Sequence, residues 1–144
     1  MDWRSELNGL MSGRTRMTRA EQENAEFEEF LNQVAKPALE EVAVELGKHD
    51  RDAQVRLAPA SVKLQVRAGE TEEIAFSVMK KYVQTGILPS AEVRINRGAS
   101  GTLKYESMLR DDPQNYPLKS VTQEDVIACF LKFYRLVMDD KAHA

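Results

Sequence analysis

Charged residues alternate with apolar ones in the middle third of the chain, and this spacing is the clearest sign of a site. Lys63 lies between two apolar residues, and so does Arg94. Successive side chains of a β-strand point to opposite faces of a sheet, so the apolar set faces a core and the charged set faces solvent. The outward set is predicted to hold six bases and three acids, which are Arg56, Lys63, Arg67, Lys81, Arg94, Lys104, Glu73, Glu92 and Glu106, together with Gln65, Ser77, Met79 and Asn96.

A basic sheet face can attract an anionic partner, which would be an acidic protein surface or a nucleic-acid backbone. It can equally be a solvated face with cross-strand ion pairs, such as Arg94 with Glu106 or Lys104 with Glu92. Platforms for single-stranded nucleic acid usually present aromatic rings, whereas Phe76 is predicted to point inwards. Tyr105 is predicted to point inwards as well, so the pattern favours a protein partner over a nucleic acid.

The other reactive residue types form no recognisable catalytic or metal-binding motif. The chain has two histidines, His49 and His143, and one cysteine, Cys129. Zinc sites commonly draw three or four ligands from such residues and carboxylates. Cys129 is interpreted as a small buried residue of a helix. The sequence therefore predicts no metal, no cofactor and no internal disulfide.

Two further motifs are interpreted as turns. Asp111 and Asp112 precede a proline, which is a common turn opening, and adjacent loop residues point apart. Gly98–Gly101 is interpreted as a hairpin loop because no helix follows whose amides could hold an anion. The alternative is a small enzyme, in which the 110–119 loop and the outer sheet face form a cleft that includes Tyr116.

Five strands must position these residues. They are predicted at 53–57, 61–67, 72–83, 90–97 and 102–108. The residues predicted to point inwards are, strand by strand, Val55 and Leu57; Val62, Leu64 and Val66; Ile74, Phe76 and Val78; Ala91, Val93 and Ile95; and Leu103 and Tyr105. The connections are short, which favours an antiparallel meander. The adjacent Lys80 and Lys81 predict that the end of the third strand is bulged or projects beyond the core.

A helical region on each side of the strands is predicted to cover one face of the sheet. The first opens with the capping-box spacing of Thr18 and Glu21, and Pro37 divides it into segments at 19–35 and 37–46. The second is predicted at 122–139, with Thr122 and Asp125 as its capping box. The fold class is therefore α+β, as a single domain over 18–140 with a frayed tail at 141–144.

Residues 1–17 are predicted to be a flexible or docking segment that holds a short helix. Asp2 would cap this helix and Gly13 would end it, with an apolar face formed by Trp3, Leu7, Leu10 and Met11. Tryptophan is favoured at binding hot spots, which makes Trp3 a candidate anchor.

The composition is that of an ordinary soluble domain. The 144 residues are 42% hydrophobic and 30% charged, with net charge −7 in residues 21–45 and +4 in residues 46–110. The first twenty residues hold four arginines and no apolar stretch, so a signal peptide is not expected. Val126–Met138 is too short to span a membrane, and the predicted location is cytoplasmic.

The predicted function is a non-catalytic protein-binding or adaptor module that acts through the outer sheet face or the N-terminal segment. Self-association through the sheet face or an edge strand is one form of this prediction. The alternative is a small enzyme, or a domain that binds an anionic ligand or nucleic acid through the basic face and the 110–119 loop. The candidate partner-binding residues are Lys63, Arg67, Lys81, Arg94, Lys104 and Trp3.

Overall fold

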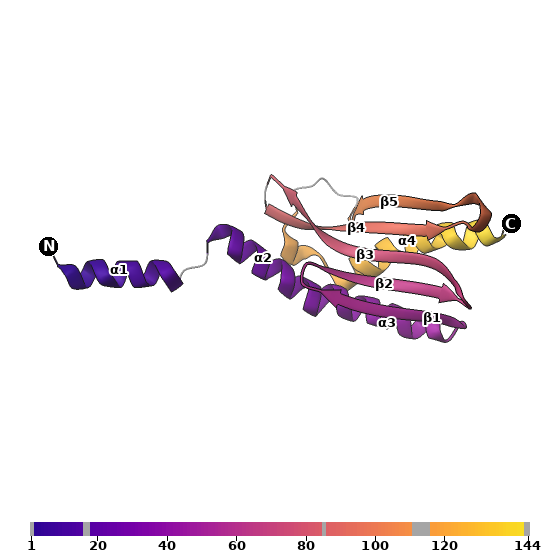
Figure 1. The fold of residues 1–144 in the computed structure, drawn as a ribbon, viewed down its shortest axis with the longest axis horizontal. Coiled ribbons are helices and arrows are strands. Elements are labelled where there is room, and N and C mark those ends of the chain that lie inside the picture. The colour runs from indigo at the N-terminus through magenta and orange to yellow at the C-terminus, as the bar shows by residue number, and fades with distance from the viewer. Residues whose placement is uncertain (1, 16–17, 85, 111–115, 143–144) are drawn as a thin grey trace.

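The computed structural model describes residues 2–15, 18–84, 86–110 and 116–142 of the chain, without the side chains of residues 12–15. Figure 1 shows its elements in chain order, which are α1 (Trp3–Thr15), α2 (Arg19–Phe30), the π-helical turn η1 (Leu31–Ala35), α3 (Lys36–Gly47), β1 (Arg51–Ala58), β2 (Ser61–Ala68), β3 (Thr71–Val83), β4 (Gly86–Asn96), the 3₁₀ turn η2 (Gly98–Ser100), β5 (Thr102–Met108), the 3₁₀ turn η3 (Leu118–Ser120) and α4 (Gln123–Ala142).

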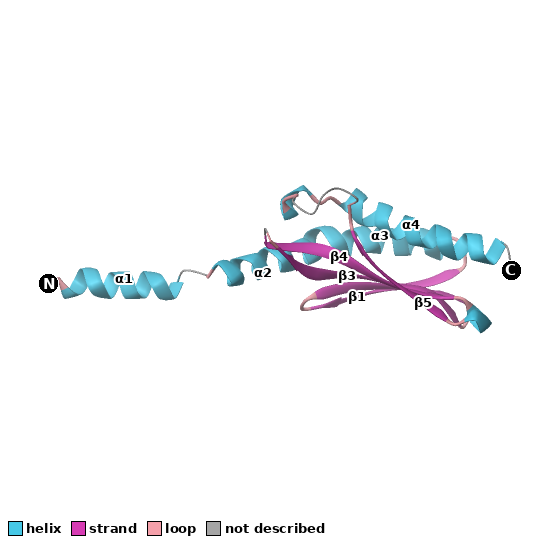
Figure 2. Ribbon diagram, turned by 90° about the horizontal axis from the view of Figure 1, so that it is seen from above, coloured by secondary structure: helices cyan, strands magenta, loops and turns pink. Residues whose placement is uncertain are grey.

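The five strands form one antiparallel meander in the order β1-β2-β3-β4-β5. Helices α3 and α4 lie on the same face of this sheet (Figure 2). The predicted α+β class and meander are confirmed. β1 and β4 begin earlier than predicted, and β4 includes Pro89. Gly98–Gly101 joins β4 to β5 as a hairpin loop, and both of its glycines have positive φ.

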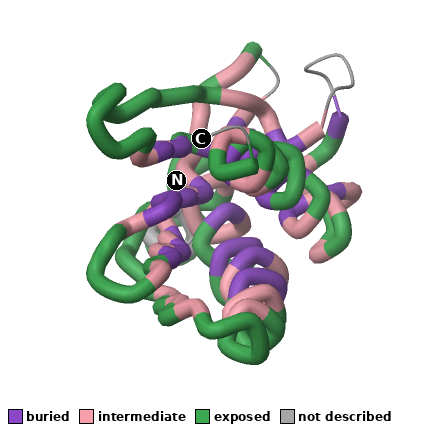
Figure 3. The backbone as a smooth tube through the Cα atoms, turned by 90° about the vertical axis from the view of Figure 1, so that its right-hand side faces the viewer, coloured by how far each residue is buried: buried purple, intermediate pink, exposed green. Residues whose placement is uncertain are grey.

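The core lies between the sheet and the helices. The predicted inward residues of β2, β3 and β4 are at most 3% exposed. The rings of Phe76 on β3 and Phe130 on α4 meet edge to face, with centroids 5.6 Å apart. Cys129 is buried here, as predicted. Figure 3 shows the buried stretches in the middle of the molecule and the hairpin turns exposed. Leu57 was predicted to face the core but is 42% exposed, because β1 is an edge strand.

The first helical region bends through a π-helical turn. Thr18 Oγ1 accepts a hydrogen bond from Glu21 N at 3.1 Å, which confirms the predicted cap. Pro37 has no N–H to donate within the helix. The chain inserts η1 just before it, where Lys36 N donates to Leu31 O, five residues back. The predicted segments 19–35 and 37–46 agree with the structure to within one residue, but the last turn of the first segment is π-helical, which was not predicted.

The irregularity in the sheet lies near the start of β3, so the predicted bulge at Lys80 and Lys81 is wrong. The other predicted alternative, a projecting end, fits better, because residues 80–83 pair with β4 but extend past the last pair of β3 with β2, Met79 with Ser61. Those two lysines pair regularly with β4. On the other side, Val66 pairs with Ile74 and Arg67 pairs with Glu72, so Glu73 is an additional residue of β3. A bulge re-aims the side chains around it.

This bulge reverses the predicted direction of Glu73. The Glu73 side chain was predicted to point outwards, but it is 1% exposed and lies on the helix side of the sheet. Glu72 takes its place on the opposite face, where it contacts Gln65 and Arg94.

The buried carboxylate of Glu73 joins β1, β3 and α4. Its Oε1 accepts hydrogen bonds from Arg51 Nε at 3.0 Å and from Tyr134 OH at 2.8 Å. Its Oε2 accepts from Arg51 Nη2 at 3.0 Å and from Lys141 Nζ. Lys141 lies in the tail predicted to fray, but α4 continues beyond its predicted end at 139 to Ala142. The Glu73 cluster, defined by these four residues, therefore anchors the last turns of α4 to the sheet.

The hydrogen bonds of the cluster decide its ionisation. Burial alone raises the pKa of the Glu73 carboxyl, but the hydrogen bonds from Arg51, Lys141 and Tyr134 outweigh burial and lower that pKa to about 2. Burial and the adjacent carboxylate raise the pKa of Tyr134 to about 12. At neutral pH the carboxylate is charged and the phenol is protonated, which is the state that these hydrogen bonds require.

Helix α1 is capped as predicted but is longer than predicted. The Asp2 carboxylate accepts a hydrogen bond from Arg4 N at 3.0 Å. The helix continues through Gly13, its predicted end, to Thr15. Its apolar residues Trp3, Leu7, Leu10 and Met11 are all exposed. Among the helices that the structure describes, none is long and apolar enough to cross a membrane.

We expect Glu73→Gln to lower the free energy of unfolding at neutral pH by about 2 kcal/mol. Breaking a buried ion pair costs more than this, but the side chains of Arg51 and Lys141 are 24% and 49% exposed, and solvent screens them once the carboxylate is gone. Urea unfolding measures the difference. Glu70→Gln, in the exposed turn between β2 and β3, is the matched control and should change little.

The same variant tests the lowered pKa of Glu73. Because the folded-state pKa is depressed, the carboxylate stabilises the fold above its ordinary pKa of 4.5, and this contribution is lost as pH falls towards about 2. Stability of the unmodified chain should therefore fall more steeply over this range than that of Glu73→Gln. If the free energy of unfolding falls equally steeply with pH in the two chains, the lowered pKa of Glu73 is contradicted.

Candidate functional site

The sheet face turned away from the helices carries polar side chains from all five strands, and we call it the outer face. The strand register arranges these side chains in rows across the sheet. The first row is Arg56, Lys63, Ser77, Glu92 and Glu106, and the second row is Gln54, Gln65, Ala75, Arg94 and Lys104.

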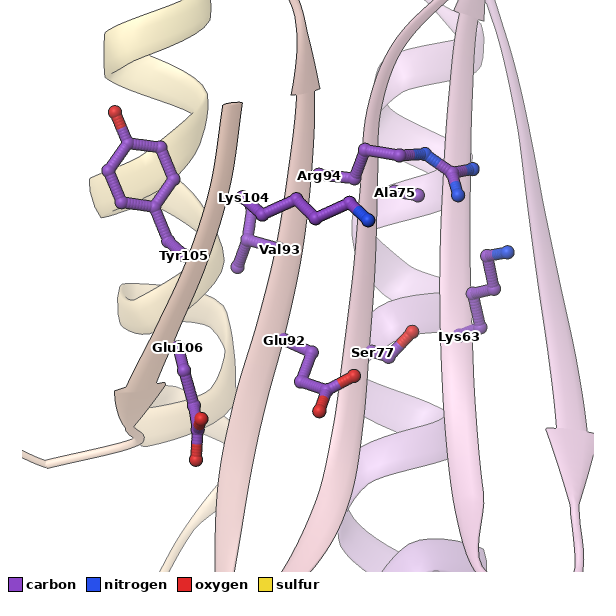
Figure 4. A pocket seen from close by; sticks show the side chains of 9 residues that line it. All are labelled: Lys63, Ala75, Ser77, Glu92, Val93, Arg94, Lys104, Tyr105 and Glu106. Carbon is purple, nitrogen blue, oxygen red and sulfur yellow. The ribbon is translucent and has the colours of Figure 1, made fainter. Parts of the chain in front are cut away.

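The outer face is hollowed near its middle strand. β3 contributes the small residues Ala75 and Ser77, while longer side chains stand on the neighbouring strands. The resulting depression has a volume of about 500 Å³. Figure 4 shows the Lys104 and Arg94 side chains extending across the sheet in the same direction, while Tyr105 points away from them. The hollow therefore has a floor of small residues and a rim of charged groups.

Two ion pairs fix part of this rim. Arg94 donates to Glu72 through Nη2 at 2.8 Å and through Nε at 3.1 Å. These hydrogen bonds keep the pKa of Glu72 below its ordinary value, although partial burial opposes them. Lys81 Nζ lies 3.2 Å from Glu106 Oε1. The predicted pair of Arg94 with Glu106 does not form, because Arg94 binds Glu72 and Glu106 binds Lys81. The predicted pair of Lys104 with Glu92 does not form either.

Like charges lie directly opposite one another in three places on the outer face. The opposed pairs are Arg56 with Lys63, Arg94 with Lys104, and Glu92 with Glu106. Such pairs each cost a few tenths of a kcal/mol. Among the described residues, Lys63, Lys104 and Glu92 form no ion pair and no hydrogen bond, although the charge of Lys63 contributes to the lowered pKa of Glu72. The fold does not require this pattern, and departures of this kind are typical of functional surfaces.

The structure brings three of the six predicted partner-binding residues to the depression, namely Lys63, Arg94 and Lys104. Lys81 lies on the same face and holds Glu106. Arg67 is exposed near the far end of β2, opposite Asp52. Trp3 is 61% exposed, and α1 lies away from the sheet (Figure 1). The outer face and α1 are therefore separate surfaces.

The predicted outward set did not include Gln54, Ala75 or Glu72, which the structure places on the outer face. Gln54 and Ala75 lie within the predicted strands 53–57 and 72–83, where alternation with Val55 and Phe76 directs them outwards. Glu72 is adjacent to another glutamate, and only the position of the bulge decides which of the two faces outwards. No feature of the local sequence marks that position.

The described residues of the 110–119 loop line no pocket together with the outer face. Asp111 and Asp112 lie outside the described residues. Tyr116 is buried beneath Arg110, whose Cζ lies 4.7 Å from the ring centroid. Tyr116 lines a pocket of about 420 Å³ formed with α2 and the start of β4, and that pocket shares no residue with the outer-face depression.

In the part of the chain that the structure describes, the remaining reactive groups do not converge on an open site. Both oxygens of the buried Glu73 carboxylate are already occupied by donors. Within the described ranges, no group of three or more His, Cys, Asp or Glu residues is placed to hold a metal ion.

The repulsion on the outer face can be measured directly. We expect Lys104→Thr to raise the free energy of unfolding by about 0.5 kcal/mol in dilute, low-salt solution, since it removes the base opposite Arg94. The gain should shrink in molar salt, which screens exposed charges. Arg67→Thr is the control and should lower the free energy of unfolding, because Arg67 lies opposite the acids Asp52 and Glu72. A loss of stability in Lys104→Thr equal to that in Arg67→Thr would show that the opposed bases do not repel.

No protein-family model, curated protein or solved structure matches the chain.

Proposed function

We propose that this protein is a non-catalytic binding module whose outer sheet face docks a protein partner. The observation that carries the proposal is the set of opposed like charges around the depression. Lys63, Lys104 and Glu92 remain without ion pairs among the described residues, although acids and bases lie close together on this face. A docked surface of complementary charge would satisfy these groups and offset their mutual repulsion.

The mixture of charges favours a protein over a nucleic acid. Glu92 and Glu106 lie in the same row as the bases and would repel a phosphate backbone. The outward residues of both rows include no aromatic side chain on which a base could stack. A protein surface, which carries both signs of charge, fits this face better.

The titratable groups support binding rather than catalysis. The groups with strongly shifted pKa values are in the Glu73 cluster, where the carboxylate is saturated by donors and buried under α4. General acid–base catalysis needs such a group within reach of a substrate. At the depression, by contrast, the charges form an open rim.

The test is affinity capture with the full chain and with Lys63→Glu combined with Lys104→Glu. Each change places an acid opposite Arg56 or Arg94, so the fold should be retained. We expect the double variant to capture at least about tenfold less of the partner than the unmodified chain, since two rim charges are reversed. Quantitative mass spectrometry measures the loss.

The matched control is Lys119→Glu combined with Arg135→Glu, which makes the same change of charge at exposed sites away from the outer face. This control should retain the partner. Trp3→Ala tests the other predicted docking segment, α1, in the same assay. Equal capture by the unmodified chain and the Lys63 and Lys104 double variant would refute the proposal, and loss in Trp3→Ala alone would move the binding site to α1.

A further inference from the structure

The first row of the outer face is antisymmetric in charge about its middle strand. Arg56 on β1 and Lys63 on β2 are positive, and Glu92 on β4 and Glu106 on β5 are negative. Ser77 on β3 lies between the two halves and pairs in register with both Lys63 and Glu92. A row of this kind is complementary to a copy of itself that runs in the opposite direction.

We infer that the outer face docks onto the outer face of a second copy of this chain, about a two-fold axis parallel to β3. This inference rests on the proposed function and names its partner. Rotation about that axis lays β2 of one copy over β4 of the other, and β1 over β5. Lys63 then faces Glu92 of the second copy, and Arg56 faces Glu106 of the second copy, with both contacts made twice.

The second row fits the same arrangement. Gln65 faces Arg94 of the second copy, and Gln54 faces Lys104 of the second copy, so amide oxygens can accept hydrogen bonds from the bases. Ala75 and Ser77 lie under the axis. Their small side chains allow the two sheets to approach the spacing of about 10 Å that is usual for stacked sheets.

The unpaired charges select this axis over the other two-fold arrangement. An axis perpendicular to the strands would place Glu92 against Arg94 of the second copy, although Arg94 is already held by Glu72. Lys63 would then still face no acid. The axis parallel to β3 instead brings together Lys63 and Glu92, which form no ion pair with any described residue of their own chain.

The size of the face fits a weak, reversible dimer. Strands about 4.8 Å apart and about seven residues long give a face of roughly 24 by 24 Å, so two faces bury about 1,100 Å². Specific interfaces of this size are at the low end of the known range. The dimer should therefore form at micromolar protein concentrations and dissociate in high salt.

Charge reversal across the two copies tests the register. Lys63→Glu alone, or Glu92→Lys alone, creates two like-charge contacts in the dimer, and each should raise the dissociation constant about a hundredfold. Within a single chain the same changes are favourable, because they place opposite charges next to Arg56 and Glu106. Loss of the dimer therefore cannot be ascribed to unfolding, and thermal denaturation of each variant checks this.

Two further samples should restore the dimer. The chain that carries both Lys63→Glu and Glu92→Lys regains opposite charges at each contact. An equimolar mixture of the two single variants should form a heterodimer, since position 63 of each chain then faces the opposite charge at position 92 of the other. Sedimentation equilibrium and native mass spectrometry measure both species, with Lys119→Glu as a control that dimerises normally.

Each other outcome has a definite meaning. A monomer at high micromolar concentration, or a dimer that is indifferent to these reversals, overturns the inference. If Arg94→Glu restores the dimer of the Glu92→Lys chain and Lys63→Glu does not, the axis parallel to β3 is wrong. If the chain is monomeric but Lys63→Glu with Lys104→Glu still loses a different captured protein, the inference fails and the proposed function stands.

Discussion

The burial of one carboxylate organises both faces of the sheet. A single additional residue in β3 turns Glu73 towards the helices, where it accepts hydrogen bonds from β1 and from two positions on α4. The same bulge leaves Glu72 on the outer face, where it fixes Arg94. Two adjacent glutamates thus form contacts on opposite faces of the sheet. One holds the C-terminal helix to the sheet, and the other fixes Arg94 on the outer face.

The division between a covered face and an open face follows from the chain order. Because both helical regions pack on the apolar face, the outer face has no cover among the described residues and its side chains are free to be charged. Stability comes from the apolar side, where residues of β2, β3 and β4 meet Phe130 and its neighbours. The outer face can therefore carry opposed like charges, whose cost is small beside the burial of the core.

Periodicity predicted the fold well because it reports directly on burial. The alternation around Leu64, Phe76 and Val93 identified residues that are nearly inaccessible, and short connections identified the meander. What could not be predicted depends on contacts between distant residues. The bulge that buries Glu73 requires Arg51, Tyr134 and Lys141 to surround it, and the pairing of Arg94 depends on that bulge. Lys63, Arg94 and Lys104 were predicted as site residues from the alternation alone. Which residues lie opposite them depends on the register of all five strands.

The direction in which the chain enters α2 has a consequence for the assembled molecule. Figure 1 shows α1 extending beyond one end of the sheet, roughly along the strands, while α2 runs from there onto the sheet. A rotation about an axis parallel to β3 does not exchange the two ends of the sheet. Both N-terminal arms of a dimer would therefore emerge at the same end, where their exposed tryptophans could engage one target together. Such a bivalent arrangement multiplies a weak contact through effective concentration rather than through additional contacts.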